Sequence, residues 1–314
     1  MDRNSSAILR MPLAALRGFK LALALAMVAS ASLVVTPRHA QAQATPSSGQ
    51  QVVLVTGSTS GLGREVALRL GAMGFHVIVH GRNAERGGQV VDEINSTGPG
   101  SARFYGADLA SFAQVRSFGE SILRDYQRLD VLVNNAGFGS APDERLLSED
   151  GHEFRFQVNY LSTFLLTNML LPRLRESTPS RIVNVSSLAQ SPIDFDDVMI
   201  ENNSSGRRAY AQSKLAQVMF TFDLAEQLEG TGIMVNSLHP ATYMPTGMVA
   251  RLGVEPVATI DEGADAVMQL VVSTDIDGGQ FFRGLEPARA NAQAYDMDAR
   301  ARLKRLSQEL TGSR

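Results

Sequence analysis

Residues 51–63 read Gln-Val-Val-Leu-Val-Thr-Gly-Ser-Thr-Ser-Gly-Leu-Gly, an apolar run followed at once by a glycine-rich turn. The run Gln51–Thr56 predicts a buried strand, and Arg64–Met73, where apolar residues recur every three to four positions, predicts a helix. The three glycines between them let the backbone turn tightly and approach a pyrophosphate, whose charge meets the unpaired N–H groups at the helix start. Taken alone the turn could lack a ligand, but in this strand–turn–helix context it predicts a nucleotide-binding unit.

The alternation of apolar runs and helical patterns continues to the end of the chain. Continuous Val/Ile/Leu strands separated by helices indicate a parallel sheet that is covered on both faces. The prediction is therefore an α/β fold over residues 45–314, a single doubly wound parallel sheet of the Rossmann type. Further strands are expected at His76–Val79, Arg103–Tyr105, Val131–Val133, Ile182–Val185, Met234–Ser237 and near Gln280–Phe282, with helices near Glu85–Ser96, over Phe112–Tyr126 and from Tyr210.

Composition narrows the classes of function. The chain has 314 residues, 44% of them hydrophobic and 19% charged, which suits one large globular domain. A net charge of -3 without clustered Lys and Arg predicts no nucleic-acid partner. The absence of cysteine excludes disulfides and thiolate catalysis but leaves the redox compartment open. No cluster of His, Asp and Glu has the spacing of metal ligands, so no metal site is expected.

The first 44 residues differ from the rest of the chain. Four basic residues precede an apolar run, Leu21–Val35, and Ala-Gln-Ala-Gln-Ala follows at positions 40–44. This layout is typical of a secretory signal peptide, and the run is short for a membrane span. Two alternatives stay open. Residues 1–44 could be an uncleaved N-terminal membrane anchor, or they could be an untranslated leader that is included because the start site was assigned too far upstream. The expected location is accordingly export or membrane association, or the cytoplasm if the leader is an artefact.

The end of the second predicted strand bears on the choice of dinucleotide. An NAD site normally offers a carboxylate there to hold the ribose 2′-hydroxyl. This strand instead ends His80-Gly-Arg-Asn83, without an acid, and Arg82 could bind a 2′-phosphate. Arg64 could add a second positive charge, although both arginines could also be solvated surface groups. The pattern favours NADP(H) and leaves NAD(H) possible, and Asp108 and Leu109 suit the adenine edge.

Tyr210-Ala-Gln-Ser-Lys214 is the candidate catalytic pattern. Residues four apart lie on one face of a helix, so the Lys214 ammonium is expected near the Tyr210 phenol. A free phenol has a pKa of about 10, and a nearby positive charge favours the phenolate. Such a group could take the proton of an alcohol while hydride leaves its carbon, or return the proton to a carbonyl. Alone, this spacing is common on helix surfaces.

The surrounding motifs give the pattern its meaning. Ser186-Ser187 ends the fifth predicted strand and could hydrogen-bond a substrate oxygen, and Asn134-Asn-Ala-Gly137 ends the fourth with small residues. Together with Thr56–Gly63, the sequence here resembles the short-chain dehydrogenase/reductase family over essentially all of residues 51–314. The matching motifs also include Asp108-Leu109, Phe156-Gln-Val-Asn159 and Tyr210–Lys214, and the long stretch Asp194–Arg208 is similar to the retinol-dehydrogenase-like branch and its bacterial relatives.

The resemblance implies a role for each matching residue. Tyr210 would be the catalytic acid/base, and Lys214 would lower its pKa and hold the nicotinamide ribose. Ser187 would position and polarise the substrate oxygen, with Ser186 as the alternative, and Asn159 would keep a water in a proton relay that ends at Lys214. The residues expected around the cofactor are Gly57, Thr59, Ser60, Gly61, Leu62, Gly63, Arg82, Asp108, Leu109, Asn135, Ala136, Gly137, Tyr210, Lys214, Pro240 and Thr242.

The predicted function is an NADP(H)-preferring oxidoreductase that interconverts an alcohol and a ketone or aldehyde. The alternatives are a non-catalytic nucleotide-binding sensor or scaffold, and an epimerase or dehydratase with tightly held nicotinamide. No anion clamp is evident in the irregular segments Ser191–Arg208 and Thr242–Thr259, so the substrate is expected to be small and partly apolar. Pro240-Ala241 stands where the family usually has Pro-Gly. Because alanine restricts the backbone more than glycine does, the loop over the nicotinamide is expected to sit differently. A homo-oligomer is an expectation from the resemblance.

Overall fold

Eight strands form one sheet in the computed structural model, which describes residues 44–202 and 204–313. Their order is β3-β2-β1-β4-β5-β6-β7-β8, so the chain winds outward in both directions from the neighbouring pair β1 and β4. This confirms the predicted doubly wound sheet. The strands are β1 (Val52–Val55), β2 (His76–Gly81), β3 (Ser101–Gly106), β4 (Val131–Asn134), β5 (Ser180–Val185), β6 (Ile233–His239), β7 (Phe281–Arg283) and β8 (Glu286–Ala288).

The central strand β1 shows why the apolar runs become strands. All four of its residues are buried, and Val53 lies between Val77 of β2 and Val131 of β4 in parallel register. A strand covered on both faces needs no alternation of polar and apolar residues, which is why the runs are continuous. Pairing is parallel from β3 to β7, and β8 alone runs antiparallel, against β7. That last strand was not predicted, because Glu286-Pro-Ala288 carries no apolar run.

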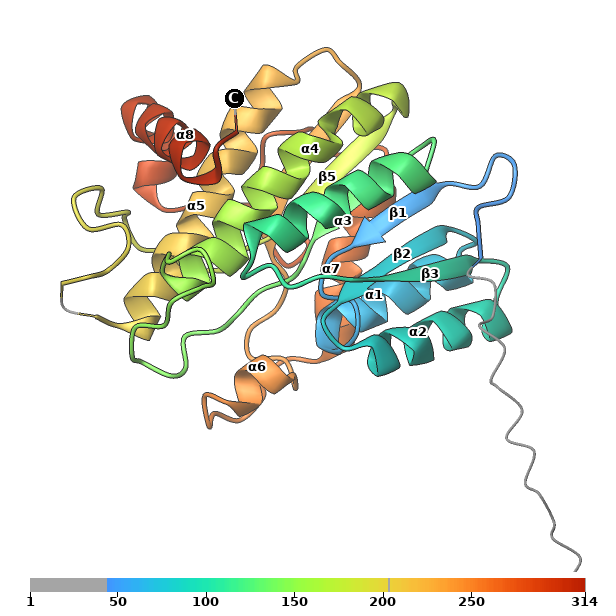
Figure 1. The fold of residues 1–314 in the computed structure, drawn as a ribbon, viewed down its shortest axis with the longest axis horizontal. Coiled ribbons are helices and arrows are strands. Elements are labelled where there is room, and N and C mark those ends of the chain that lie inside the picture. The colour runs from blue at the N-terminus through green and yellow to red at the C-terminus, as the bar shows by residue number, and fades with distance from the viewer. Residues whose placement is uncertain (1–43, 203, 314) are drawn as a thin grey trace, which may run out of the picture. The chain divides into compact units, whose positions relative to one another are not determined.

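Helices cover both faces of the sheet and enclose a separate apolar core on each side (Figure 1). The helices α1, α2 and α7 close one core, and α3, α4 and α5 close the other, over which α8 also packs. The bounds are α1 (Gly61–Ala72), α2 (Ala84–Thr97), α3 (Phe112–Asp125), α4 (Ser162–Glu176), α5 (Gly206–Gln227), α6 (Gly247–Ala250), α7 (Ile260–Val272) and α8 (Met297–Thr311), with a π-helix at Phe156–Leu161 and a 3-10 helix at Ala292–Tyr295.

The helix that carries the candidate catalytic pattern begins earlier than predicted. α5 starts at Gly206 rather than Tyr210, because the Ser205 side chain accepts a hydrogen bond from the Arg208 N–H and so caps the helix. One turn of α5 therefore precedes Tyr210. It is buried on almost every side, by the sheet, the π-helix and α8.

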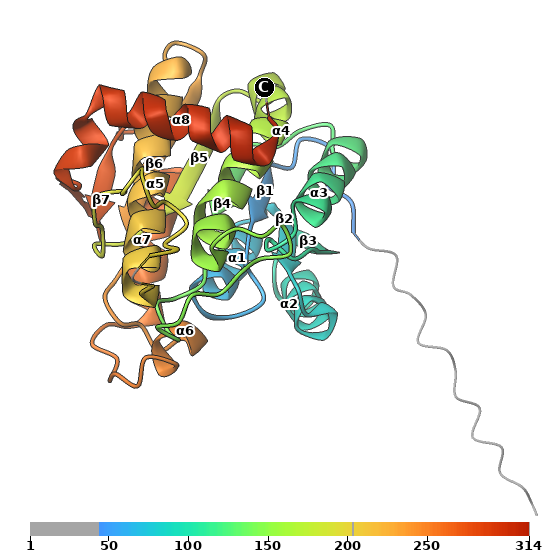
Figure 2. The ribbon, with the colours of Figure 1, turned by 60° about the vertical axis from the view of Figure 1, so that its left-hand side comes forward.

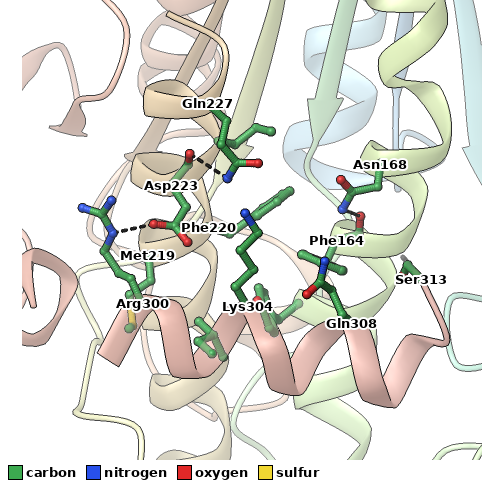
Figure 3. A pocket seen from close by; sticks show the side chains of 13 residues that line it. Phe164, Asn168, Met219, Phe220, Asp223, Gln227, Arg300, Lys304, Gln308 and Ser313 are labelled. Carbon is green, nitrogen blue, oxygen red and sulfur yellow. Dashed lines mark hydrogen bonds and ion pairs between the residues drawn. The ribbon is translucent and has the colours of Figure 1, made fainter. Parts of the chain in front are cut away.

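Helix α8 crosses over α5 and the start of α4 on the outer side of the molecule (Figure 2). A cavity of about 150 Å³ remains between these three helices, with a floor of buried aromatic side chains and a polar rim. Lys304 of α8 reaches up between Asp223 and Gln227 of α5 and Asn168 of α4 (Figure 3). The cavity lies along the distal half of α5, beyond Lys214.

The N-terminal predictions lie outside the described residues. The signal-peptide and anchor interpretations of residues 1–44 concern positions that, apart from Ala44, the structure does not describe. Within the described ranges, no helix combines the length and the apolar character that crossing a membrane requires.

Candidate active site

The residues singled out in the sequence gather at one edge of the sheet, where the parallel strands end. The glycine turn follows β1, Arg82 follows β2, Asp108 and Leu109 follow β3, and the Asn135–Gly137 segment follows β4. Ser187 follows β5, while Pro240 and Thr242 follow β6. This is the edge at which open α/β sheets bind their ligands.

The glycine turn leaves room for an anion at the start of α1. Gly57 has a φ of +66°, and a Cβ there would lie 2.8 Å from the Cα of Ala136. A Cβ on Gly63 would lie 2.3 Å from Nδ2 of Asn135. Ser60, the N-cap residue, makes no side-chain cap, and the first turn of α1 carries no acidic residue. The N–H groups and positive dipole of this helix start therefore remain suited to a pyrophosphate.

Thr56 and Asn135 join the glycine turn to the segment after β4. The Thr56 hydroxyl oxygen accepts hydrogen bonds from the backbone N–H groups of Asn135 and Ala136, each at 3.0 Å. In return the Asn135 carboxamide donates to the carbonyl oxygens of Thr56 (2.9 Å) and Gly57 (3.3 Å). Asn135 was predicted to lie around the cofactor, and in the structure its carboxamide joins the segment after β4 to the glycine turn. The role of Thr56 was not predicted.

His80 holds the glycine turn from the second strand. The Gly57 N–H donates to Nδ1 of His80 (3.1 Å), and Ser58 accepts from the His80 N–H (3.0 Å) while donating to the Val55 carbonyl (2.7 Å). Burial lowers the pKa of His80 to about 4, so the ring is neutral at neutral pH. Because Nδ1 accepts a hydrogen bond, the proton belongs on Nε2. Neither His80 nor Ser58 was predicted as a site residue, although both lie beside the motif.

Of the two arginines considered for a 2′-phosphate, only Arg82 faces the ligand edge. Its side chain is 66% exposed and its guanidinium lies 3.4 Å from the carboxylate of Asp108. Arg64 instead forms an ion pair with Glu93 on α2. The positive charge of Arg64, which was considered as a second contact for a 2′-phosphate, is therefore already paired with Glu93 on the outer surface of α1 and α2.

Tyr210, Lys214 and Ser187 come together beside the end of β5. The Lys214 ammonium lies 5.8 Å from the centre of the Tyr210 ring and donates to the Val185 carbonyl at 2.9 Å. Tyr210 and Ser187 share a side-chain hydrogen bond. The neighbouring Ser186 turns the other way and donates to the Lys214 carbonyl at 2.7 Å. Of the two serines, Ser187 is the one whose hydroxyl faces the phenol.

The titration of Tyr210 and Lys214 differs from the simple expectation of a lowered phenol pKa. Burial raises the pKa of Tyr210, and the hydrogen bond with Ser187 only partly opposes that rise. Burial also lowers the pKa of Lys214 to about 7. The Lys214 ammonium itself donates to the Val185 carbonyl at the end of β5.

Asn159 lies in the π-helix, which was not predicted. Its carboxamide accepts from the Phe138 N–H (2.7 Å) and donates to the Phe138 carbonyl (3.1 Å) and the Ser213 hydroxyl (2.8 Å). Asn159 therefore fixes the backbone just beyond Gly137 to the helix that carries Tyr210 and Lys214. π-Helical turns are frequent at functional sites.

The segment 242–259 forms a bridge between the glycine turn and the segment after β4. A Cβ on Gly61 would lie 3.2 Å from Cγ2 of Thr246, and a Cβ on Gly139 would lie 2.7 Å from Cγ of Met248. The bridge thus contacts the glycine turn on one side and the segment after β4 on the other. Its first turn is anchored by a hydrogen bond between Thr242 and His239 (2.9 Å).

The residues at this edge fit a dinucleotide with a nicotinamide ring. An open helix start suits the pyrophosphate, Arg82 lies at the end of β2, and the small residues after β4 leave space next to Lys214 and Tyr210. Within residues 44–202 and 204–313, no group of three or more His, Asp or Glu side chains has the arrangement of a metal site.

Comparison with known proteins places the chain among enzymes of one kind. The family model described as short chain dehydrogenase matches residues 51–255. Human retinol dehydrogenase 14 is 36% identical over 292 residues, covering 83% of this chain and 86% of that protein. Mouse retinol dehydrogenase 13 is 35% identical over 282 residues, covering 83% and 84%.

Solved structures agree. An uncharacterized protein from Mycobacterium paratuberculosis is 32% identical with a TM-score of 0.71, covering 85% of this chain and 95% of that one. A protein described as a short chain dehydrogenase from Shigella flexneri, solved with NADP, is 27% identical with a TM-score of 0.59, covering 75% and 97%. With the fold and the ligand edge described above, these matches identify the protein as a member of the short-chain dehydrogenase/reductase family, in its retinol-dehydrogenase-like branch, and as an NAD(P)-dependent oxidoreductase.

Proposed function

We propose that the protein is an NADP(H)-preferring oxidoreductase that interconverts an alcohol and a ketone or aldehyde through Ser187, Tyr210 and Lys214. One observation carries this proposal. The Tyr210 phenol, whose pKa is raised by burial and partly lowered by its interaction with Ser187, is flanked by the Lys214 ammonium at the same sheet edge as the glycine turn. A proton donor, an oxygen-binding hydroxyl and a positive charge thus converge beside the nicotinamide end of the groove.

The chemistry follows from these three groups. In reduction, the Tyr210 phenol donates its proton to the carbonyl oxygen, to which the Ser187 hydroxyl also donates a hydrogen bond. In oxidation, the phenolate takes the proton of the alcohol, and the charge of Lys214 favours that phenolate. A nicotinamide cofactor, when bound, supplies or accepts the hydride. The raised pKa of Tyr210 keeps it as a phenol at neutral pH, which is the form that reduction requires.

Replacing the phenol hydroxyl tests the catalytic assignment. We expect Tyr210→Phe to lower kcat by roughly 100-fold or more, the usual contribution of a general acid, while the Kd for NADPH stays close to the wild-type value. Tyr295→Phe is the control, because Tyr295 is 42% exposed on the 3-10 helix Ala292–Tyr295 and loses the same atom. Steady-state kinetics with a panel of aldehydes, ketones and alcohols gives the readout.

Two outcomes would contradict the assignment in different ways. Wild-type turnover by Tyr210→Phe would remove Tyr210 from the chemistry. If the wild-type protein bound NADPH but turned over no member of the panel, a nucleotide-binding sensor on the same fold would replace the enzyme.

The preference for NADP(H) rests on the end of β2. No acid stands there, Arg82 is exposed beside the groove, and one structural relative was solved with NADP. A guanidinium pairs with a phosphate dianion through charge-assisted hydrogen bonds, which NADH cannot offer. We expect Arg82→Ala to raise the Kd for NADPH at least tenfold and to leave the Kd for NADH nearly unchanged.

Fluorescence titration with each cofactor measures this effect. Arg124→Ala is the matched control, because Arg124 is 67% exposed and also pairs with an aspartate, on the surface of α3. Tighter binding of NADH than of NADPH by the wild-type protein would contradict the preference.

We propose that the substrate is small and partly apolar. The retinol dehydrogenases among the relatives are named for an apolar alcohol. Beside Gly137 and Gly139, the bridge presents the apolar side chain of Met248, and Phe138 lies between them in sequence. A substrate panel graded by chain length tests this, and faster turnover of charged over apolar carbonyls would contradict it.

The N-terminal leader is proposed to direct export or to anchor the protein to a membrane. The basic residues, the apolar run Leu21–Val35 and the small residues after it support this proposal. Sequencing the N-terminus of the protein from its native cell tests it. A new terminus near residue 45 would indicate a cleaved signal, whereas an intact leader in a cytoplasmic fraction would contradict both forms of the proposal.

A further inference from the structure

Lys214 has an unusual set of partners for a buried ammonium. The residue is 3% exposed, and its two hydrogen-bond acceptors are the Val185 carbonyl (2.9 Å) and Oε1 of Gln217 (2.8 Å). Neither acceptor is charged, and no carboxylate forms an ion pair with Lys214 among the described residues. Uncharged acceptors are therefore what stabilise a positive charge in this part of the core.

Gln217 is itself fully buried, at 0% exposure, one turn beyond Lys214 on α5. Its Nε2 has no hydrogen-bond partner among the described residues. The reverse orientation of the carboxamide would set an NH₂ group against the ammonium, so the oxygen is the atom that faces Lys214. An apolar residue could fill this volume without burying an unpartnered donor. The polar side chain thus makes one useful contact, and that contact is with Lys214.

We propose that Gln217 is a positioning residue of this oxidoreductase, whose carboxamide oxygen keeps Lys214 in its ammonium form and holds Nζ beside Tyr210 and the nicotinamide groove. The proposal rests on the proposed function for its catalytic meaning, but the contact itself does not. An ammonium has three donors, and two are used by Val185 and Gln217. The third is left for a hydroxyl of the cofactor or substrate.

The balance between the ammonium and the neutral amine of Lys214 is sensitive to the loss of an acceptor, because burial already lowers the pKa of Lys214 to about 7. The other titratable groups that face Lys214 are Tyr210 on its own helix and His239 at the end of β6. His239 has a pKa of about 4 and is neutral near pH 7, and the pKa of Tyr210 is raised. The groups that approach from β4, β5 and the π-helix are uncharged. Losing one acceptor therefore shifts the equilibrium of Lys214 without compensation.

The composition of the chain makes a direct measurement possible. The lysines are Lys20, Lys214 and Lys304, so a full-length protein labelled with ¹³C at lysine Cε gives few signals. Lys304→Arg and Lys214→Arg assign them. The chemical shift of Lys214 followed against pH, without added cofactor, reports its titration independently of any turnover.

Two substitutions move the titration in opposite directions. Gln217→Met keeps the side-chain length and removes the acceptor, so the midpoint of Lys214 is expected to fall by at least one pH unit. Gln217→Glu keeps the shape and adds a negative charge, so the midpoint is expected to rise by at least one pH unit. Should Gln217→Met fail to fold, the glutamate variant carries the test.

Gln212 supplies a matched control. It lies on the same helix, is equally buried, and has an unpartnered Nε2, but its oxygen accepts from the Asp194 N–H (3.1 Å). Gln212→Met is expected to leave the Lys214 midpoint unchanged. An unchanged midpoint in both Gln217 variants, or an equal shift in Gln212→Met, would overturn the proposal.

Kinetics connects the contact to function. The alkaline limb of the kcat/KM profile is expected to move with the Lys214 midpoint, to lower pH in Gln217→Met and to higher pH in Gln217→Glu. At pH 7 a one-unit fall corresponds to a loss of roughly fivefold in the charged form. A shifted NMR midpoint in a protein that turns over no substrate would defeat the proposed function alone, whereas normal turnover with an unshifted midpoint would defeat the role of Gln217 alone.

Discussion

At the scale of single residues, the glycine turn is held by polar side chains that themselves need not touch a ligand. Thr56 reaches across to the segment after β4, and Ser58 and His80 pin the turn to β1 and β2. The Ser58 bond to the Val55 carbonyl is local. The bond from Gly57 to His80 and the bonds of Thr56, however, join segments that are 23 to 80 residues apart in sequence. Such partners cannot be read from local spacing, which explains why the motif predicted the turn but not its supports.

The buried His80 predicts a pH dependence of stability. Its pKa is about 4 in the folded protein against 6.5 as the reference, so the unfolded chain binds more protons between these values. The contribution of His80 is complete above pH 6.5 and is lost as the pH falls toward 4, by about 3 kcal/mol. Urea unfolding of the wild type and of His80→Asn, measured from pH 7 to pH 4, isolates this contribution.

Asparagine is chosen because its Oδ1 can accept from the Gly57 N–H without titrating in this range. The wild type should lose about 3 kcal/mol more than His80→Asn over the interval. His76 and His239, whose pKa values are also lowered to about 4, contribute equally to both proteins. Parallel losses in the two proteins would show that protonation of His80 does not oppose folding.

At the scale of elements, adjacent glycines in α2 separate packing from helix propensity. A Cβ on Gly87 would lie 2.2 Å from the ring of Phe104 on β3, whereas a Cβ on Gly88 would meet nothing within 4 Å. We expect Gly88→Ala to stabilise the protein by about 0.5–1 kcal/mol through better helix propensity. Gly87→Ala should destabilise it by roughly 1–3 kcal/mol because α2 must move off the sheet.

Thermal and urea unfolding of the two variants measure these changes side by side. Since the residues are neighbours in one helix, their propensity terms are the same and the difference between the variants is due to packing. Equal effects of the two substitutions would mean that α2 does not press against β3 as closely as the Gly87–Phe104 contact requires.

The elements also show how far the sequence could lead. Strands β1, β2, β4, β5 and β6 follow from their apolar runs, because strands buried on both faces are rich in apolar residues, whereas β3 is only partly buried. The π-helix could not be predicted, since it arises where Asn159 must reach Phe138 and Ser213 at once. Likewise β8 is defined by its pairing with β7 rather than by its own residues. The roles of Ser187, Tyr210 and Lys214 stay predictions until the substitutions above are made.

At the scale of the whole molecule, the described residues form two apolar cores separated by one sheet, with the candidate site along a single edge. The two halves of α5 lie in different surroundings. One half carries Tyr210 and Lys214 at the candidate site, and the other half packs beneath α8. The glycine turn, Arg82 and the segment after β4 come from the first half of the chain, whereas Ser187, Tyr210 and Lys214 come from the second half.

The bridge formed by the segment 242–259 has a consequence for the kinetic order of the reaction. Thr246 lies next to the glycine turn and Met248 next to the segment after β4, so we expect a dinucleotide bound between them to enter and leave only when the bridge moves away. We also expect the closed bridge to form one wall of the pocket for a carbonyl substrate. We therefore expect compulsory-order kinetics, in which the dinucleotide binds first and departs last. An inert carbonyl analogue should inhibit uncompetitively against NADPH. Noncompetitive inhibition would mean that the cofactor and the carbonyl substrate bind in random order.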